Sequence, residues 1–350
     1  MRLQKGIEVI MDNLKIYLDK DIDINLIKSK KIAIIGFGSQ GWGQSMNLRD
    51  SDCEIVLGLR QGGKSDIKAR NAGFKTMSIE DAVKWADIVQ ILIPDELQAQ
   101  VYMEQILPNM HSGQYLMFSH GFNIHYKKIL PKEDINVIMV APKGPGHTVR
   151  SEYEKGKGVP SLIAIYQDIT GNSKEVALSY ASAIGAGRAG IIETSFKEET
   201  ETDLFGEQAV ICGGVSALMK AGFEVLVEAG YSRHMAYFEV LHEMKLIIDL
   251  VNQGGLADMR YSISNTAEYG DMTRGPRVIG EDSKNAMRAI LKEIQSGKFA
   301  EEFTSEMSSG CANFNKLRTD NANHPIEKTG EEIRSSFVWG QDKIINKDRN

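Results

Sequence analysis

The chain has 350 residues, of which 42% are hydrophobic and 25% charged, and its formal net charge at pH 7 is −6. This length allows a sizeable core and two domains, and the composition is that of an ordinary soluble protein. The mildly acidic balance gives no electrostatic footprint for nucleic acid or for an anionic membrane. Any anionic ligand must therefore be held by a local site.

The N-terminal sequence lacks a basic segment followed by an apolar stretch, and no run of roughly 18 apolar residues occurs. We therefore expect a cytoplasmic protein that binds neither membrane nor nucleic acid. The three cysteines, Cys53, Cys212 and Cys311, have neither CxxC nor His-paired spacing. This pattern favours structural thiols over a disulfide, a zinc site or a nucleophile.

Residues 1–30 are polar and rich in aspartate, and we expect an N-terminal arm or a short helix there. From residue 31, apolar strands alternate with helical stretches such as IEDAVKWA, which predicts an α/β fold with a doubly wound parallel sheet. The expected strands are KIAII, EIVLGLR, DIVQILIP, QYLMFS, NVIMVAP and PSLIAIYQD.

The strand spacing disappears near Glu193, and almost every long segment beyond it reads as helical. Residues 204–230 are apolar around most of the helix circumference, so they are expected deep in a core or in a subunit interface. Helices are expected over 203–229, 234–253, 282–296 and 326–338. The predicted divisions are a 1–14 N-terminal extension, a 15–194 dinucleotide-binding domain, a 195–340 all-α domain and a 341–350 polar tail.

A G-x-G-x-x-G loop, Gly36 to Gly41, follows the first strand and opens a helix, as a dinucleotide-binding loop requires. Its glycines allow a tight turn and close approach to a pyrophosphate, although an ordinary glycine turn is the alternative. The second strand ends at Arg60, and Ser65 follows in a basic turn. These groups suit a 2′-phosphate, so we expect NADPH. The neighbouring Asp66 leaves NADH possible, and a solvated basic turn is the alternative.

Polar residues follow three later strands, at 94–98, 119–123 and 142–147. Ligands in such sheets bind outside the carboxyl ends of the strands, so these loops can line one crevice. His120 could carry a proton near neutral pH, and Lys143 could place a fixed cation near a substrate oxygen. The alternatives are a structural histidine and a surface lysine.

Two pairs of carboxylates have i,i+4 spacing in apolar helical sequence, and each pair stacks like charges on one helix face. Such pairs need a cation, a shared proton or water, and four carboxylates suit two hard cations such as Mg²⁺. The pairs are Asp203 with Glu207 and Glu239 with Glu243. Other acidic residues are assigned to a solvated face or to the domain junction: Glu198, Glu199 and Glu201.

Several motifs in sequence order resemble ketol-acid reductoisomerases, also called acetohydroxyacid isomeroreductases, in their short class I form, over about residues 15–340. They include GFGSQGWGQSMNLRDS, SHGFNIH, APKGPGHTVR, DLFGEQAVICGG and RYSISNTAEYGD. The resemblance implies a Rossmann domain, a knotted helical domain, a homo-dimer or an assembly of dimers, NADPH and two Mg²⁺. It also implies Mg²⁺-dependent alkyl migration and NADPH-dependent reduction of 2-acetolactate, or 2-aceto-2-hydroxybutyrate, in valine and isoleucine biosynthesis.

The resemblance makes His120 and Lys143 catalytic residues and lets Ser264 contact the substrate; on its residues alone, Ser264 could equally cap a turn. Asp203 would bridge both metals and Glu207 would bind one of them, while a partner subunit would supply Glu239 and Glu243. The implied cofactor-binding residues are Phe37, Gly38, Ser39, Gln40, Arg60, Ser65, Asp95, Glu96, Leu97, Gln98 and Gly146.

The chain departs from the family pattern at Trp42 and Gly43, which stand where His-Ala is usual, and at Phe37, where Tyr is common. Two rival readings remain. A metal-free 2- or 3-hydroxyacid dehydrogenase shares the glycine-loop sheet but gives no reason for two embedded acidic pairs. A catalytically silent NADP-binding sensor or scaffold predicts cofactor binding without turnover.

Overall fold

The computed structural model describes residues 14–336. Its internal contacts divide these residues into two units, of which the first ends at Thr200 and the second begins at Glu201. The predicted boundary was placed near residue 194. The predicted N-terminal extension, apart from Leu14, and the predicted polar tail lie outside the described residues.

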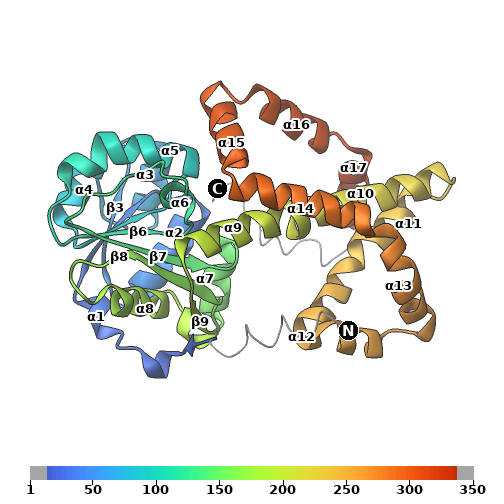
Figure 1. Cartoon of the computed structure of the whole chain (residues 1–350), viewed down its shortest axis with the longest axis horizontal. Coiled ribbons are helices and arrows are strands. Elements are labelled where there is room, and N and C mark those ends of the chain that lie inside the picture. The colour runs from blue at the N-terminus through green and yellow to red at the C-terminus, as the bar shows by residue number, and fades with distance from the viewer. Residues whose placement is uncertain (1–13, 337–350) are drawn as a thin grey trace. The chain divides into compact units, whose positions relative to one another are not determined.

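The first unit is built on a sheet that has nine strands within the described residues, in the order β1-β9-β8-β7-β6-β5-β2-β3-β4 (Figure 1). The strands are β1 (Ile16–Tyr17), β2 (Lys31–Ile35), β3 (Glu54–Gly58), β4 (Thr76–Met77), β5 (Ile88–Ile91), β6 (Tyr115–Phe118), β7 (Asn136–Pro142), β8 (Ser161–Gln167) and β9 (Ile191–Glu193). The strands from β4 to β7 in this order are parallel. The central strands are buried on both faces, as helix-covered parallel strands must be. The predicted Rossmann-type α/β class is confirmed.

The other side of the sheet departs from the parallel pattern. β8 pairs antiparallel with β7, β9 pairs parallel with β8, and β1 pairs antiparallel with β9. Ile16 lies opposite Ile192, so part of the segment expected as an arm or short helix adds an edge strand. The sequence predicted β8 as one strand of a parallel sheet, and its antiparallel pairing corrects that expectation, because an apolar run does not record the orientation of its partner.

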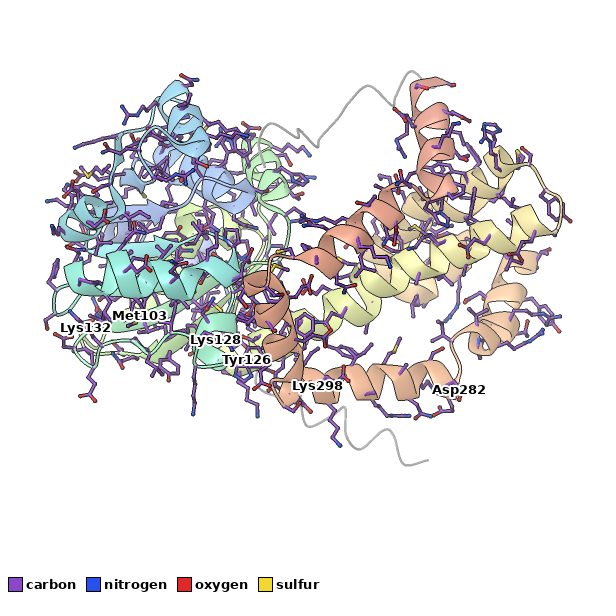
Figure 2. The ribbon with its side chains drawn as sticks, turned by 90° about the horizontal axis from the view of Figure 1, so that it is seen from above. Met103, Tyr126, Lys128, Lys132, Asp282 and Lys298 are labelled. Carbon is purple, nitrogen blue, oxygen red and sulfur yellow. The ribbon has the colours of Figure 1, made fainter. Side chains whose placement is uncertain are left out.

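Helices cover both faces of the sheet, and the side chains of β2 alternate between two cores. Ile32 and Ile34 join one apolar cluster with residues of α1, α2 and α8. Ala33 and Ile35 join the other, with residues of α4 and η3. The helices of this unit are η2 (Asp19–Asp21), α1 (Asn25–Lys28), α2 (Ser39–Asp50), α3 (Lys64–Asn71), α4 (Ile79–Trp85), α5 (Asp95–Val101), π-helical η3 (Tyr102–Ile106), η4 (Leu107–Asn109), α6 (Phe122–His125), α7 (Gly146–Glu154), α8 (Ser173–Ala183) and η5 (Ala186–Arg188). Met103 of η3, labelled in Figure 2, is exposed.

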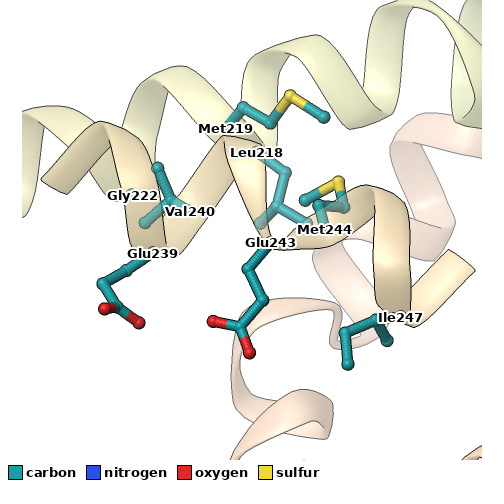
Figure 3. Close-up of a pocket in the computed structure, with 8 residues that line it drawn as sticks. All are labelled: Leu218, Met219, Gly222, Glu239, Val240, Glu243, Met244 and Ile247. Carbon is teal, nitrogen blue, oxygen red and sulfur yellow. The ribbon is translucent and has the colours of Figure 1, made fainter. Parts of the chain in front are cut away.

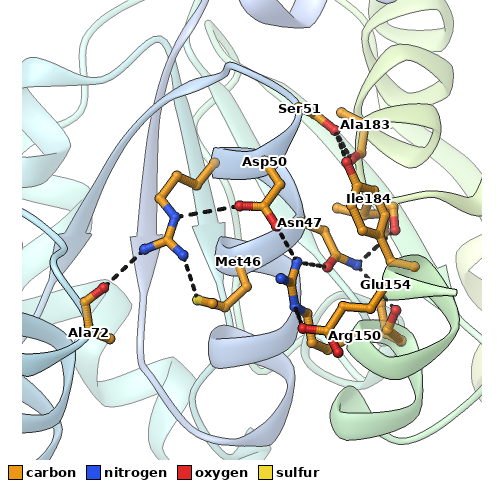
Figure 4. Close-up of polar contacts among 12 residues, drawn as sticks. Met46, Asn47, Asp50, Ser51, Ala72, Arg150, Glu154, Ala183 and Ile184 are labelled. Atoms are coloured by element: carbon orange, nitrogen blue, oxygen red, sulfur yellow. Dashed lines mark hydrogen bonds and ion pairs between the residues drawn. The ribbon is translucent and has the colours of Figure 1, made fainter. Parts of the chain in front are cut away.

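A buried polar network joins α2 to α7 (Figure 4). Asn47 Nδ2 donates to the carbonyl oxygens of Val149, at 3.2 Å, and Ile184, at 3.0 Å. Arg150 Nη1 lies 3.0 Å from Asn47 Oδ1 and 2.7 Å from Asp50 Oδ2. Because Asn47 is fully buried, its paired hydrogen bonds fix the two helices against each other.

The second unit is helical, as predicted. Its small core joins Phe223, Ala236, Tyr237, Ile326 and Ile333. The helices are α9 (Phe196–Gly206), which crosses the boundary, π-helical η6 (Glu207–Ile211), α10 (Gly213–Glu228), α11 (Arg233–Tyr237), π-helical η7 (Phe238–His242), α12 (Met244–Ser262), α13 (Asn265–Val278), α14 (Glu281–Gln295), α15 (Lys298–Ser308), α16 (Ala312–Ala322) and α17 (Pro325–Ser336). Figure 2 labels Asp282 and Lys298 near the two ends of α14.

The helical unit differs from its sequence expectation in several places, and the helix expected over 234–253 is divided into α11, η7 and α12, which ends at Ser262. The long helix expected over 203–229 is interrupted by η6. The segment expected as a loop around Ser264 begins α13, and α15 and α16 were not expected at all. The residues before α15 and α16, Gly297 and Cys311, have positive φ, so each helix begins directly after a sharp turn. The polar sequence around these turns gives no clear signal for a helix start.

Candidate active site

The loop between β2 and α2 has the predicted dinucleotide-binding shape. Gly36 has φ of 109°, a conformation that favours glycine, and a Cβ there would lie 2.6 Å from the carbonyl oxygen of Leu92. A Cβ on Gly41 would lie 2.5 Å from the carbonyl oxygen of Gly36. Gly38, by contrast, has open space beside its Cα, and α2 begins at the next residue, Ser39. Open space at a helix N-terminus suits a pyrophosphate.

The loop after β7 packs directly on the start of α2. Gln40 Nε2 donates to the carbonyl oxygen of Gly144 at 2.9 Å. A Cβ on Gly146 would lie 2.1 Å from the carbonyl oxygen of Ser39, and a Cβ on Gly43 would lie 2.3 Å from that of Gly146. Glycine at these places therefore lets two backbone segments touch. This contact gives a physical reason for Gly43, one of the departures noted in the sequence.

Two residues predicted to bind the cofactor also have structural contacts. The Phe37 ring is buried and meets Phe74 edge-on, with 5.6 Å between the centroids. Gln98 is buried, and its Nε2 donates to the carbonyl oxygen of Ile93 at 2.9 Å and to Asp95 Oδ1 at 3.0 Å. The other residues predicted on this loop lie in the first turn of α5: Asp95, Glu96 and Leu97.

The turn between β3 and α3 is held by Asp66, which is buried. Hydrogen bonds from Thr76 and Arg70, and then from the amide of Gly62, lower the pKa of this carboxyl to about 2. The distances to Asp66 are 2.9 Å from both Arg70 Nε and the Gly62 amide. Asp66 is therefore committed to the turn, while the predicted phosphate-binding residues of this turn are exposed. They are Arg60 and Ser65.

The loops after β6 and β7 bring His120 and Lys143 to the same carboxylate, that of Glu199. Lys143 Nζ donates to Glu199 Oε1 at 2.8 Å, and His120 Nδ1 lies 3.1 Å from Oε2. The amide of Gly121 donates to Oε2 at 3.0 Å. The Glu199 side chain is 1% exposed. Of the two expectations for Glu199, a solvated face was wrong, because α9 packs that face onto the loop after β6, whereas a position at the domain junction agrees with the division after Thr200.

Glu199 is ionised over the ordinary pH range. Burial raises the pKa of its carboxyl, but the hydrogen bond and charge of His120, and then the charge and hydrogen bond of Lys143, outweigh that effect. The pKa falls from 4.5 to about 2. A charged carboxylate in turn stabilises a protonated Lys143 and a protonated His120 beside it.

The start of α9 explains how Glu199 reaches the loop after β6. Ser195 caps the helix, since its Oγ accepts from the Glu198 amide at 3.0 Å. A Cβ on Gly121 would lie 2.3 Å from Thr200 Oγ1 and 2.8 Å from the carbonyl oxygen of Phe196. Only glycine at 121 therefore lets the first turn of α9 come this close.

Glu199 is the first of three carboxylates that continue along one side of the helix. Asp203 follows one turn later, and Glu207, another four residues on, begins η6. Both are half-buried. The i, i+4, i+8 spacing of Glu199, Asp203 and Glu207 is visible in the sequence and could have identified Glu199. The sequence prediction included only the last two residues.

The second predicted pair, Glu239 and Glu243, lies where η7 passes into α12. Figure 3 shows both carboxylates pointing away from apolar side chains that line a cavity of about 430 Å³. The lining residues are Leu218, Met219, Gly222, Glu239, Val240, Glu243, Met244 and Ile247. The two acidic pairs belong to separate helices, and their meeting across a subunit boundary stays a prediction.

Ser264 occupies the N-cap of α13, where its Oγ accepts from the amide of Ala267 at 3.3 Å. This is the capping position that the sequence left as an alternative. A role in substrate contact stays a prediction.

A glycine-loop sheet, a histidine and a lysine at its strand ends joined by the buried Glu199, and a following helical unit define a dinucleotide-dependent oxidoreductase. Family models assign the chain more narrowly. The one described as acetohydroxy acid isomeroreductase, NADPH-binding domain, matches residues 26–190, and the one described as ketol-acid reductoisomerase, C-terminal domain, matches 196–339. The chain belongs to the ketol-acid reductoisomerase family, and it is an oxidoreductase with isomerase activity.

Solved structures agree with this assignment. The chain is 46% identical to an NADH-preferring ketol-acid reductoisomerase from an uncultured archean, with a TM-score of 0.91 and coverage of 93% of this chain and 99% of that one. A putative oxidoreductase from Jannaschia sp. CCS1 and a semialdehyde dehydrogenase NAD-binding protein from Cupriavidus necator are 15% and 19% identical. Each gives a TM-score of 0.59 and covers 76% of this chain. The match covers 97% of the Jannaschia chain and 99% of the Cupriavidus chain. These two share the fold alone.

Proposed function

We propose that this protein catalyses Mg²⁺-dependent alkyl migration in 2-acetolactate, or in 2-aceto-2-hydroxybutyrate, and then NADPH-dependent reduction to the 2,3-dihydroxy-3-alkyl acid. The reaction would serve valine and isoleucine biosynthesis. The observation that carries the proposal is the position of Glu199. It holds a histidine and a lysine at the strand ends and stands one helical turn before Asp203, the first predicted metal ligand.

The donor sets of the two acidic pairs fit Mg²⁺, which prefers oxygen ligands and retains some water. Asp203 and Glu207 are half-buried, whereas Glu239 and Glu243 are exposed at the edge of an apolar cavity. Carboxylates at i,i+4 repel one another, so a cation between them relieves a cost that the fold otherwise carries. These four residues would hold the metal ions.

The β2–α2 loop fits a nicotinamide dinucleotide, because open space at Gly38 adjoins the N-terminus of α2. The exposed Arg60 and Ser65 support NADPH, since a guanidinium and a hydroxyl suit a 2′-phosphate. Asp66 does not oppose this reading, because its carboxylate is bound to Arg70 and Gly62. The related archaeal enzyme prefers NADH, so the ratio of the two cofactors is a direct test.

When bound, Mg²⁺ would supply Lewis acidity toward the hydroxyl and ketone oxygens, and the nicotinamide would supply hydride. The chain's own residues provide placement and charge. Lys143, held by its ion pair with Glu199, offers a fixed positive charge to an oxygen that becomes negative. His120 is oriented through Nδ1 by Glu199, which suits an indirect role in proton transfer or in ordering a water molecule.

We also propose that the protein is a homo-oligomer. By length and composition, residues 196–228 could cross a membrane; an 18-residue stretch within them has a mean hydropathy of 1.7, and only 6% of that stretch is buried. Burial of this helix in the core was one of two expectations, and it was wrong for the described residues. The same helix carries Asp203 and Glu207 and packs Phe223 into the core of the second unit. We therefore expect the exposed Leu218 and Val225 to be buried against a second copy of the chain and not against lipid.

The proposal is tested by following oxidation of NADPH with 2-acetolactate, with and without Mg²⁺, and again with NADH. We expect Mg²⁺-dependent turnover, and we expect Glu207→Gln to lose turnover at limiting Mg²⁺ while the exposed Glu228→Gln on α10 does not. Turnover that needs no Mg²⁺ would favour a hydroxyacid dehydrogenase. Tight NADPH binding without turnover would favour a sensor.

A further inference from the structure

The helix that carries Asp203 and Glu207 does not continue as a regular α-helix into α10. The π-helical turn η6 lies between α9 and α10, and in it the amide of Cys212 donates to the carbonyl oxygen of Glu207, five residues back, at 3.1 Å. Cys212 itself has φ of −118° and ψ of −65°. One extra residue in a turn changes the rotational phase of the helix beyond it by about 100°. The rotation about the helix axis between the face that carries Asp203 and the face of α10 that packs Phe223 into the core therefore differs from that of a regular helix.

Two consecutive glycines make this turn possible. A Cβ on Gly213 would lie 2.1 Å from the carbonyl oxygen of Gln208, and a Cβ on Gly214 would lie 2.2 Å from that of Ala209. Both obstacles are backbone atoms of the π turn itself, so no side-chain rotation can relieve them. A glycine further along α10 does not share this constraint, because a Cβ on Gly222 would meet Val240 at an ordinary 3.4 Å.

The second acidic pair lies on a π turn, whereas the first pair ends where its π turn begins. Glu239 lies inside η7, and the amide of Glu243 donates to the carbonyl oxygen of Phe238 at 3.1 Å, again five residues back. Met244 follows, so this π turn forms without glycine. π turns occur often at functional sites, and here both acidic pairs have one. The dependence on glycine is confined to the pair on α9 and η6.

We propose that Gly213 and Gly214 are positioning residues for the metal site. They permit the π turn that fixes the direction of the Asp203 and Glu207 carboxylates relative to α10, which packs against α11 and η7. If η6 relaxed to an α turn, the acidic face would rotate by about 100° away from that direction. This inference rests on the proposed function, because it assumes that these carboxylates hold Mg²⁺.

The test is Mg²⁺ binding to the full-length protein by titration calorimetry, which needs no turnover. We expect Gly213→Ala to weaken Mg²⁺ affinity about tenfold or more, as loss of an orienting contact does at metal sites. We expect the Kd for NADPH, set by the first unit, to stay unchanged. The control, Gly270→Ala on α13, where a Cβ would meet open space, should bind both as the unchanged protein does.

A second variant separates misplacement from misfolding. Deletion of Cys212 removes the extra residue, so a regular helix can form without crowding; we expect a cooperative thermal transition, normal NADPH binding and weakened Mg²⁺ affinity. Undiminished Mg²⁺ affinity in either variant would overturn the inference. If the unaltered protein bound no Mg²⁺, the proposed function itself would fail, whatever the glycine variants did.

Discussion

At the scale of single residues, the carboxylate of Glu199 accepts from Lys143, from the Gly121 amide and, when Nδ1 carries a proton, from His120. Removing its charge leaves a lysine and a histidine beside a buried neutral group, without the anion that pairs with both. We expect Glu199→Gln to reduce kcat about ten- to hundredfold, the usual range for loss of proton or electrostatic assistance. Steady-state kinetics with Glu198→Gln, an exposed neighbour, as the control would check this. Equal rates in the two variants would remove Glu199 from the mechanism.

The same residue gives a pH dependence with a defined sign. Its folded pKa of about 2 lies below the ordinary 4.5, so its contribution to stability is full above pH 4.5 and is lost as the pH falls toward 2. The shift corresponds to about 3 kcal/mol. We expect the Tm difference between the unaltered protein and Glu199→Gln to be largest near neutral pH and to shrink between pH 4.5 and 2. A difference that stayed constant over this range would contradict the assignment.

At the scale of elements, the close contact of α2 with α7 depends on glycine. A Cβ at position 43 would lie 2.3 Å from the carbonyl oxygen of Gly146, so Gly43→Ala must push the start of α7 away from the dinucleotide loop. We expect a loss of about 1–3 kcal/mol in stability, as overpacking usually costs, and weaker NADPH binding. The measurements are Tm and the fluorescence of bound NADPH.

A matched substitution separates this crowding from a general effect of alanine. Gly270 lies in α13 with open space where its Cβ would be. Gly270→Ala should keep or raise Tm, because alanine favours a helix over glycine. If both variants lowered Tm equally, the α2–α7 contact would not explain the requirement at position 43.

At the scale of the whole molecule, the described part of the helical unit leaves large apolar side chains exposed on α10 and α12. They include Leu218, Val225, Leu246, Ile248 and Leu256. We expect the protein to be a dimer or larger in solution, and Leu246→Glu to lower its mass as measured by light scattering. Leu130→Glu, at an even more exposed leucine of the first unit, should leave the mass unchanged. A monomeric unaltered protein would contradict the proposed assembly.

Assembly and activity can be linked by mixing two inactive variants. If the two acidic pairs meet across a subunit boundary, Glu207→Gln and Glu239→Gln carry their defects on different sides of each site. Unfolded together and refolded, they would form mixed dimers in which one site has both pairs intact, and activity should return. Activity that stays absent in verified mixed dimers would place all four carboxylates within one subunit.

The sequence alone determined the α/β unit, the helical unit and the glycine loop, because periodicity and glycine spacing are local properties of the chain. It placed His120 and Lys143 at strand ends by the same local logic. It did not find Glu199, the direction of β8 or the helix over 265–278. The helix over 265–278 begins at the Ser264 cap, a local signal that also fits a turn. The other two depend on what lies opposite, since Gly121 admits α9 and the antiparallel partner orients β8. Tertiary structure decided them because burial and pairing are set by residues far apart in the chain.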